Sequence, residues 1–239
     1  MFKYPDIKDC TAVILAGGLG TRLRSVVSDR PKPLAEVHNR PFLTYLLDQL
    51  VTFEIRYAVL CTGYLGEQVK AVLGSEWKTL ALAYSQEHSP LGTGGAIRLA
   101  MPKIQSETTL IMNGDSYFSA NLKDFWIWHH QKNAKASLLL AQVNDTQRFG
   151  RVQVNDEGQV LKFEEKGNAQ AAGWINAGIY LIQKPLLEFV PEKKAISLEQ
   201  EVFPTWIGQG FYGSYGQGNF LDIGTPESYQ SAAKFFGKH

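Results

Sequence analysis

The first half of the chain alternates short apolar runs with segments of helical character, and this alternation limits the fold more than any other feature. Four of the runs are predicted strands: Thr11–Leu15, Tyr57–Thr62, Leu80–Ser85 and Thr108–Met112. Three segments between them are predicted helices: Phe42–Phe53, Gly66–Leu73 and Gly94–Met101. Strands that are apolar throughout and separated by helices predict a mostly parallel sheet with helices on both faces.

Beyond residue 120 the pattern becomes less regular. The predicted strands are Ala136–Val143, Arg151–Val154, Gln159–Phe163 and Trp174–Ile182, and residues 155–158 have the composition of a hairpin turn. The predicted helices are Leu122–Asn133, Lys184–Phe189, Leu198–Phe203 and Thr225–Phe236, the last with Thr225 as its N-cap. With no repeat or linker in view, residues 1–239 are expected to form one α/β domain whose second half supplies the walls of a pocket.

The amino-acid composition excludes several classes of function for this chain. The chain is 44% hydrophobic and 20% charged with a formal net charge of +1, so we expect neither a nucleic acid nor a membrane as a partner. The N-terminal residues lack the apolar stretch of a signal peptide. Cys10 and Cys61 have no metal-type spacing and fit buried thiols in a reducing cytoplasm. His129 and His130 also lack metal-type spacing and are interpreted as surface residues.

A glycine-rich loop, Leu15–Arg24, follows the first predicted strand. Three glycines allow close backbone approach to phosphate oxygens, and Arg22 and Arg24 add fork-shaped donors. Lys32 lies between two prolines and is placed to reach the same phosphates. The loop lacks the Gly-Lys-Ser/Thr ending of a P-loop, and Leu23 stands where a dinucleotide fingerprint needs its third glycine. A triphosphate cradle of another kind is the remaining interpretation.

Several motifs, taken in order along the chain, make it resemble the sugar-1-phosphate nucleotidyltransferases. They are Gly17-Gly18-Leu19-Gly20-Thr21-Arg22-Leu23, Arg30-Pro31-Lys32-Pro33-Leu34, Pro90-Leu91-Gly92-Thr93-Gly94-Gly95-Ala96, Asn113-Gly114-Asp115, Phe163-Glu164-Glu165-Lys166, Asn176-Ala177-Gly178-Ile179-Tyr180 and Phe220-Leu221-Asp222-Ile223-Gly224-Thr225-Pro226. The resemblance implies a nucleotide-diphospho-sugar transferase (GT-A-like) fold: a Rossmann-like, mixed sheet with helices on both faces. It also implies a nucleotide-binding half over about residues 1–120 and a sugar-phosphate-binding half over about residues 121–239.

The resemblance assigns the chemistry to a few charged groups. Asp115 and Asp222, each at the end of an apolar stretch, would bind Mg²⁺, which suits carboxylates and substrate phosphates. Arg22, Lys32 and Asp115 would be the catalytic residues. The nucleotide-binding residues would be Leu15, Ala16, Gly17, Gly18, Gly20, Thr21, Arg22, Glu87, Gly92 and Thr93. No covalent nucleophile is needed, because positioning and charge neutralisation supply most of the acceleration.

On the acceptor side, the resemblance points to sugar-phosphate contacts from Asn113, Gly150, Glu165, Lys166 and Asn176. In the loop assigned to the base, Glu87 is an acceptor that matches the N1–H and N2–H₂ donors of guanine better than the carbonyl edge of uracil. This favours GTP as the nucleoside triphosphate.

The finer pattern is similar to the D-glycero-α-D-manno-heptose 1-phosphate guanylyltransferases, which would make the product a GDP-heptose. Mannose-1-phosphate guanylyltransferases and N-acetylmuramate-1-phosphate uridylyltransferases remain alternatives. A non-catalytic nucleotide-sugar-binding regulatory subunit is a further alternative, but it would be expected to lose Arg22, Lys32 or a metal aspartate. The C-terminal β-helix of longer relatives is not expected, and the sequence leaves a homo-oligomer open.

Overall fold

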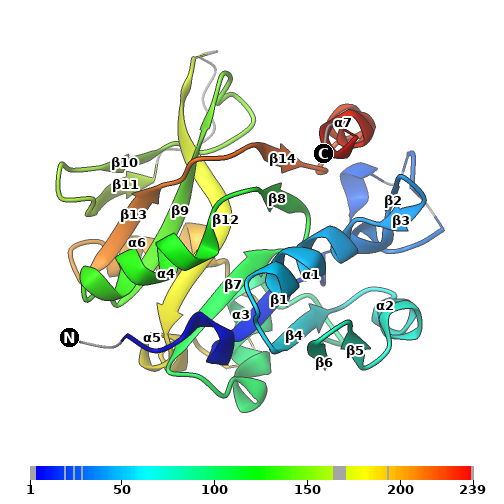
Figure 1. Ribbon diagram of the computed structural model, residues 1–239, viewed down its shortest axis with the longest axis horizontal. Helices are drawn as coiled ribbons and strands as arrows, with labels where there is room; N and C mark the ends of the chain where they lie inside the picture. Colours follow the sequence, from blue (N-terminus) through cyan, green and yellow to red (C-terminus); the bar gives the residue numbers. More distant parts are fainter. Residues whose placement is uncertain are drawn as a thin grey trace.

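An eight-stranded sheet forms the centre of the protein (Figure 1). The computed structural model describes residues 4–18, 20–23, 25–27, 29–163, 171–192 and 194–237. Across the sheet the strands are β13 (Phe211–Tyr215), β9 (Ala136–Val143), β12 (Gly173–Gln183), β7 (Thr108–Asn113), β1 (Thr11–Leu15), β4 (Tyr57–Thr62), β6 (Leu80–Gln86) and β5 (Glu76–Trp77). The four strands predicted in the first half are therefore neighbours at its centre.

The sheet is mixed. Strands β7, β1, β4 and β6 run parallel to one another, as the alternation with helices predicts. Strand β12 is antiparallel to both β7 and β9, whereas β13 is parallel to β9 and β5 antiparallel to β6. The antiparallel pairings at the middle of the sheet come from β12 in the second half of the chain, where the helix-strand alternation stops, whereas the β5–β6 hairpin at the edge belongs to the first half.

Helices cover both faces of the sheet because the side chains of its strands alternate in direction. Ala12 and Ile14 of β1 belong to the core layer on one face, while Val13 belongs to the layer on the other. The first layer is covered by α1 (Leu43–Thr52), α2 (Gly66–Leu73), α4 (Leu122–Gln131) and α7 (Pro226–Phe236). The second is covered by α3 (Gly92–Ala100), α5 (Lys184–Glu188) and α6 (Phe203–Trp206), with the π-helical turn Leu198–Val202 before α6.

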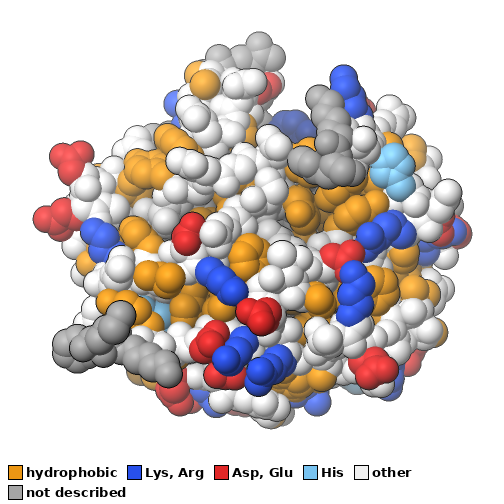
Figure 2. Space-filling model, in the orientation of Figure 1, with side chains coloured by type: hydrophobic (Ala, Val, Ile, Leu, Met, Phe, Trp, Pro, Cys, Tyr) orange, Lys and Arg blue, Asp and Glu red, His pale blue; other side chains and the backbone are white. Residues whose placement is uncertain are grey.

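Three two-stranded sheets complete the strands that the structure describes. They pair β2 (Glu36–Val37) with β3 (Arg40–Pro41), β8 (Ser116–Phe118) with β14 (Phe220–Asp222), and β10 (Val152–Val154) with β11 (Val160–Phe163). The last pair forms the predicted hairpin around residues 155–158. In Figure 1, β14 lies between the hairpin at the upper left and α7 at the upper right. The space-filling view in Figure 2 is notched at its upper edge over the same region.

Helix α7 begins as its sequence predicts. The Thr225 hydroxyl accepts a hydrogen bond from the backbone N–H of Ser228 at 3.4 Å, and Pro226 takes the first helical position. This cap fixes the start of the helix three residues after Asp222. Among the described residues no helix combines the length and the apolar character needed to cross a membrane.

The two free cysteines are buried as predicted, but the interpretation of the two histidines as surface residues is wrong. His129 is fully buried, because helical spacing places it on the face of α4 that also carries Leu122, Phe125 and Trp126. Its Nδ1 lies 2.8 Å from the Ser137 hydroxyl, and burial lowers the pKa of the His129 imidazole to about 3. The adjacent His130 is half-buried, and burial lowers its pKa as well.

Candidate active site

A cavity of about 300 Å³ opens where the parallel strands end. Strand β1 ends at Leu15, which lies opposite Asn113 of β7 on one side and Cys61 of β4 on the other. Ligands bind at this edge in open α/β sheets. The cavity is lined by Leu15, Ala16, Gly17, Gly18, Lys32, Pro33, Glu87, Pro90, Gly92, Thr93, Ala96, Asn113, Gly114 and Asp115. Most of the residues that sequence assigns to the nucleotide therefore line one cavity.

The floor of the cavity is built from two loops in close backbone contact. The N–H of Gly114 donates to the carbonyl oxygen of Leu15 at 2.9 Å. A Cβ atom at position 114 would lie 2.6 Å from that same oxygen, so only glycine allows this approach. The contact fixes the turn that carries Asp115 against the start of the glycine-rich loop.

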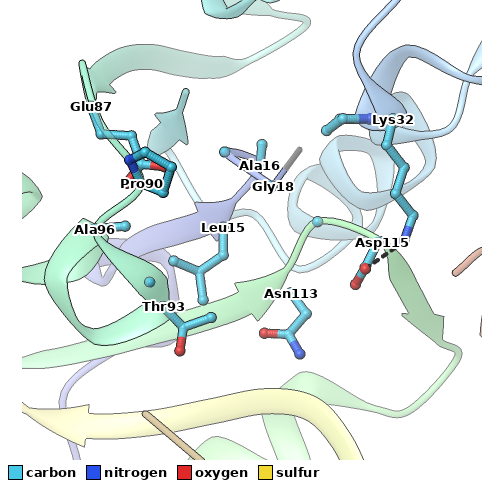
Figure 3. A pocket seen from close by; sticks show the side chains of 14 residues that line it. Leu15, Ala16, Gly18, Lys32, Glu87, Pro90, Thr93, Ala96, Asn113 and Asp115 are labelled. Atoms are coloured by element: carbon cyan, nitrogen blue, oxygen red, sulfur yellow. Dashed lines mark hydrogen bonds and ion pairs between the residues drawn. The ribbon is translucent and has the colours of Figure 1, made fainter. Parts of the chain in front are cut away.

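Lys32 and Asp115 form an ion pair inside the cavity. The Nζ of Lys32 lies 2.6 Å from Oδ2 of Asp115 (Figure 3). Lys32 begins the 3₁₀ turn Lys32–Leu34, and its side chain is only 10% exposed. The phosphate-directed cation and the proposed metal ligand are thus direct neighbours, although 83 residues separate them in the sequence.

Asp222 comes to the same place through the pairing of β14 with β8. It lies opposite Ser116, and the N–H of Ile223 donates to the Asp115 carbonyl at 2.9 Å. Burial and the nearby Asp115 carboxylate raise the pKa of Asp222, while Lys32 and the N–H of Gly224 oppose that rise. The two carboxylates that sequence assigns to the metal therefore interact electrostatically at one end of the cavity.

The donor chemistry at this end suits Mg²⁺. Carboxylate oxygens are hard ligands, and Mg²⁺ in nucleotide enzymes takes one or two of them, with phosphates and water completing its shell. In the part of the chain that the structure describes, no group of three or more His, Cys, Asp or Glu side chains could hold a metal. Asp115 and Asp222 therefore fit a metal that binds together with a phosphate substrate.

Glu87 lies at the opposite end of the cavity from Lys32 and Asp115 (Figure 3). Its Oε2 accepts a hydrogen bond from the N–H of Leu91 at 3.0 Å. Among the hydrogen bonds of the described residues none involves Oε1, which is therefore available to a ligand. Burial raises the pKa of this carboxyl group. A single acceptor is thus left at the end of the cavity farthest from Lys32.

Thr93 and Asn113 lie between these ends, and their hydrogen bonds differ. The Thr93 hydroxyl donates to Oε2 of Glu199 at 3.1 Å and accepts from the N–H of Leu198 at 2.8 Å, so it supports the fold. Oδ1 of Asn113 is buried without a partner. A buried acceptor of this kind is costly unless a ligand satisfies it. Asn113 is accordingly the described residue best suited to receive a substrate hydroxyl.

The remaining residues assigned by sequence are placed differently. Arg22 lies on the exposed 3₁₀ turn Thr21–Leu23 and does not line the cavity. Gly20 precedes that turn with a φ of +60°, and Gly150 follows Phe149 in a loop beyond the cavity lining. Asn176 donates to the Tyr180 hydroxyl at 2.8 Å and accepts from the N–H of Gly178. Glu165 and Lys166, with Arg24 and the side chain of Thr21, lie outside the described residues.

Two residues that contact members of the site, Arg148 and Glu199, were not predicted from the sequence. Arg148 donates to Oδ1 of Asp222 at 2.7 Å. Glu199 accepts hydrogen bonds from both Thr93 and the buried Tyr180 hydroxyl, the latter at 3.0 Å. The available signals were an arginine two residues before Gly150 and a glutamate within the predicted helix Leu198–Phe203, and neither is distinctive alone.

Comparison with known proteins identifies the family. A family model described as "Nucleotidyl transferase" matches residues 11–239. The chain belongs to this family. Membership confirms the expected activity class, an enzyme of nucleotidyl transfer. It also agrees with the position of the glycine-rich loop directly after β1.

Individual relatives of this nucleotidyl transferase match it over most of its length. The D-glycero-alpha-D-manno-heptose 1-phosphate guanylyltransferase of Aneurinibacillus thermoaerophilus is 38% identical over 224 residues, which cover 93% of this chain and 96% of that protein. The mannose-1-phosphate guanylyltransferase of Mycobacterium tuberculosis is 34% identical over 91% of this chain and 62% of its own length. The structure of HddC from Yersinia pseudotuberculosis complexed with GMP-PN is similar with a TM-score of 0.84 and 31% identity, covering 95% of this chain and 99% of that one. These similarities confirm the nucleotide-diphospho-sugar transferase fold.

Proposed function

We propose that this nucleotidyl transferase is a guanylyltransferase that converts GTP and D-glycero-α-D-manno-heptose 1-phosphate into a GDP-heptose and pyrophosphate. The observation that carries the proposal is the polarity of the cavity. Lys32 and Asp115 line one end, with Asp222 beside them. Glu87, of which Oε2 is engaged by Leu91, lines the other end. Triphosphate and guanine have the matching arrangement of charge and donors. The similarity to the heptose enzyme over 93% of the chain supports the choice of sugar.

The reaction needs one bond made and one bond broken. A phosphate oxygen of the sugar 1-phosphate attacks the α-phosphorus of GTP in line, and the bond to the pyrophosphate leaving group breaks. Lys32 binds the triphosphate, and Arg22, which is exposed on its 3₁₀ turn outside the cavity lining, would have to swing toward the leaving pyrophosphate when substrates bind. Such cations stabilise charge that develops in the transition state.

Asp115 and Asp222 would hold the divalent ion, which we propose is Mg²⁺. When bound, it neutralises phosphate charge and orients the triphosphate. The chain itself contributes the placement of the two carboxylates, through the turn after β7 and the β8–β14 pair. The ion pair with Lys32 orients the Asp115 carboxylate before substrates arrive.

Fewer observed contacts support the residues that we propose for binding the sugar 1-phosphate. Oδ1 of Asn113 is the unpaired acceptor for a sugar hydroxyl. The resemblance adds Gly150, Glu165, Lys166 and Asn176, with Lys166 on the sugar phosphate. We propose a cytoplasmic location for this chemistry, in keeping with two unpaired and buried cysteines.

Mannose 1-phosphate is the second candidate acceptor, because the mannose-1-phosphate guanylyltransferase of M. tuberculosis is 34% identical to 91% of the chain. Initial rates with GTP and separate sugar 1-phosphates distinguish the two. We expect the heptose 1-phosphate to give the higher kcat/KM. A higher value for mannose 1-phosphate would reassign the sugar, and turnover with N-acetylmuramate 1-phosphate and UTP alone would overturn the guanylyltransferase proposal.

A further inference from the structure

Arg148 forms an ion pair with Asp222, one of the two carboxylates assigned to the metal. Its guanidinium donates to Oδ1 of Asp222 at 2.7 Å and lies 3.4 Å from the Ser228 hydroxyl of α7. The same guanidinium lies over the Phe149 ring, 5.5 Å from its centroid. The Arg148 side chain is 43% exposed and that of Asp222 is 18% exposed, so the pair lies at the mouth of the site.

The ion pair between Arg148 and Asp222 resembles the one between Lys32 and Asp115. Each proposed metal ligand thus has one cation on it, and the four side chains together carry no net charge. A metal ion bound by Asp222 would lie close to a fixed positive charge if Arg148 stayed in place. Like charges at this separation repel, and the metal also needs the carboxylate lone pairs that the guanidinium uses.

Arg148 can move away from Asp222 more easily than Lys32 can move away from Asp115. The Lys32 side chain is 10% exposed and lies within the cavity, whereas Arg148 reaches Asp222 from an exposed loop. Within the described residues Arg148 forms no second ion pair, although a backbone hydrogen bond and, to a lesser extent, the Arg148 charge lower the pKa of the nearby Glu227 carboxyl group. Its ion pair with Asp222 is accordingly the weaker restraint, since solvent screens half-exposed pairs.

We infer that Arg148 neutralises Asp222 in the metal-free enzyme and must release it when the divalent ion binds, so that Arg148 lowers the metal affinity of the free enzyme. This inference rests on the proposed function, because it takes Asp115 and Asp222 as the metal ligands. Arg148 is a positioning residue here: it acts through Asp222. Once released, its guanidinium lies two residues from Gly150, on the loop proposed to face the sugar phosphate.

The test is Mn²⁺ binding to the full chain without substrates, measured from the electron paramagnetic resonance signal of free Mn²⁺. Arg148→Gln is expected to bind Mn²⁺ about fivefold more tightly than the native protein, the upper range for a half-exposed ion pair. Arg148→Met, which keeps apolar packing on Phe149, should tighten binding equally. Arg148→Lys, which keeps the charge, should stay close to the native affinity.

Lys234→Gln is the matched control. Lys234 lies on α7, as Ser228 does, and its replacement removes the same charge. Its Mn²⁺ affinity should not change, and a rise equal to that of Arg148→Gln would show a general charge effect and overturn the inference. Unchanged or weaker binding in both Arg148→Gln and Arg148→Met would also overturn it, since loss of structure weakens a site and cannot tighten it.

Asp222→Asn separates this inference from the metal assignment. It should lose most Mn²⁺ binding. Native-like binding in Asp222→Asn would contradict the assignment of the metal ligands and the inference with it. Loss of binding in Asp222→Asn with no tightening in the Arg148 variants would overturn the inference alone and leave the metal assignment intact.

Discussion

Lys32 shows how one residue connects the sequence, the fold and the proposed chemistry. Two prolines flank it in the sequence, and in the structure it starts a short 3₁₀ turn that aims the side chain into the cavity. Its ammonium group pairs with Asp115 while leaving room for phosphate oxygens in the same space. Since the ion pair lines a cavity, its loss is expected to affect turnover more than folding.

Lys32→Ala and Asp115→Asn are therefore each expected to lower kcat by at least about 10²-fold, the scale seen when one charge-stabilising group is removed. Steady-state pyrophosphate release measures this effect, and thermal unfolding checks the fold. Lys70→Ala, an exposed lysine of α2, is the control and should keep native turnover. Near-native turnover in either site variant would contradict its assignment.

Glu87→Gln tests the base assignment. Oε1 of the ionised carboxylate is a charged acceptor for the guanine donors, whereas the glutamine amide is neutral and can present a competing NH₂ group in its place. Hydrogen bonds to charged groups contribute about 1.5–3 kcal/mol, so kcat/KM for GTP should fall about 10- to 100-fold. The exposed Glu67→Gln should change nothing. An unaltered preference for GTP in Glu87→Gln would rule out this carboxylate as the base reader.

Sequence predicted the residues of this site unevenly. Lys32, Glu87, Asn113 and Asp115 were singled out from motifs, and all four line the cavity, although their roles stay predictions. Arg22 was assigned with them, but its side chain is exposed. A motif fixes the spacing of residues along the backbone and leaves the direction of a long side chain open, so the sequence could not place this guanidinium. Arg148 could not be found in advance, since its partner Asp222 is 74 residues away in the sequence.

At the scale of elements, the β8–β14 pair carries much of the site. It brings Asp222 beside the turn that holds Asp115, and α7 begins directly behind it. The intervening Gly224 donates its N–H to Oδ1 of Asp222 at 3.0 Å. A Cβ atom there would lie 2.8 Å from the same oxygen. The position of the carboxylate therefore depends on a short connection with no space for a side chain.

Gly224→Ala is expected to displace the Asp222 carboxylate and lower kcat about tenfold or more. Overpacking of this kind costs roughly 1–3 kcal/mol in the free energy of unfolding. Mn²⁺ affinity and urea unfolding measure the two effects separately. Native Mn²⁺ affinity in a folded Gly224→Ala protein would show that the carboxylate does not need this contact.

The packing of α4 on β9 predicts a dependence of stability on pH. Burial lowers the pKa of His129 to about 3 in the folded protein, from about 6.5 for a histidine exposed to water, so the folded state resists protonation. Its stabilising contribution is complete above pH 6.5 and falls as the pH drops toward 3. At about 1.4 kcal/mol per pH unit, the loss between pH 7 and pH 5 is about 2 kcal/mol.

His129→Gln should remove that loss. Urea unfolding at pH 7 and pH 5 is the measurement, and the difference between the two free energies of unfolding should be about 2 kcal/mol smaller in the variant than in the native protein. An equal difference in both proteins would mean that other groups control acid stability.

Elements were predicted best where local patterns are strong. The parallel strands and the hairpin around residues 155–158 were found from sequence, with ends shifted by one or two residues. Strands β8 and β13 were missed, because three to five residues with glycine or aromatic content carry little periodicity. The predicted helix Leu198–Phe203 is a π-helical turn followed by α6. Local patterns do not distinguish these helix types.

At the scale of the whole molecule, the lining of the cavity comes from the first half of the sequence, and the predicted contribution of the second half to its walls is not seen among the described residues that line it. The second half brings Asp222 beside the turn that carries Asp115, next to the cavity. Acidic and basic side chains are interspersed on the face shown in Figure 2, in line with the formal net charge of +1.

The central claim is that this cavity transfers a guanylyl group to a sugar 1-phosphate. The most direct test supplies D-glycero-α-D-manno-heptose 1-phosphate with GTP, ATP, UTP or dTTP in turn, in the presence of Mg²⁺, and measures pyrophosphate release. We expect release with GTP at a kcat/KM at least about tenfold above the other triphosphates, together with a GDP-sugar product. Strong turnover with UTP and none with GTP would contradict the central claim.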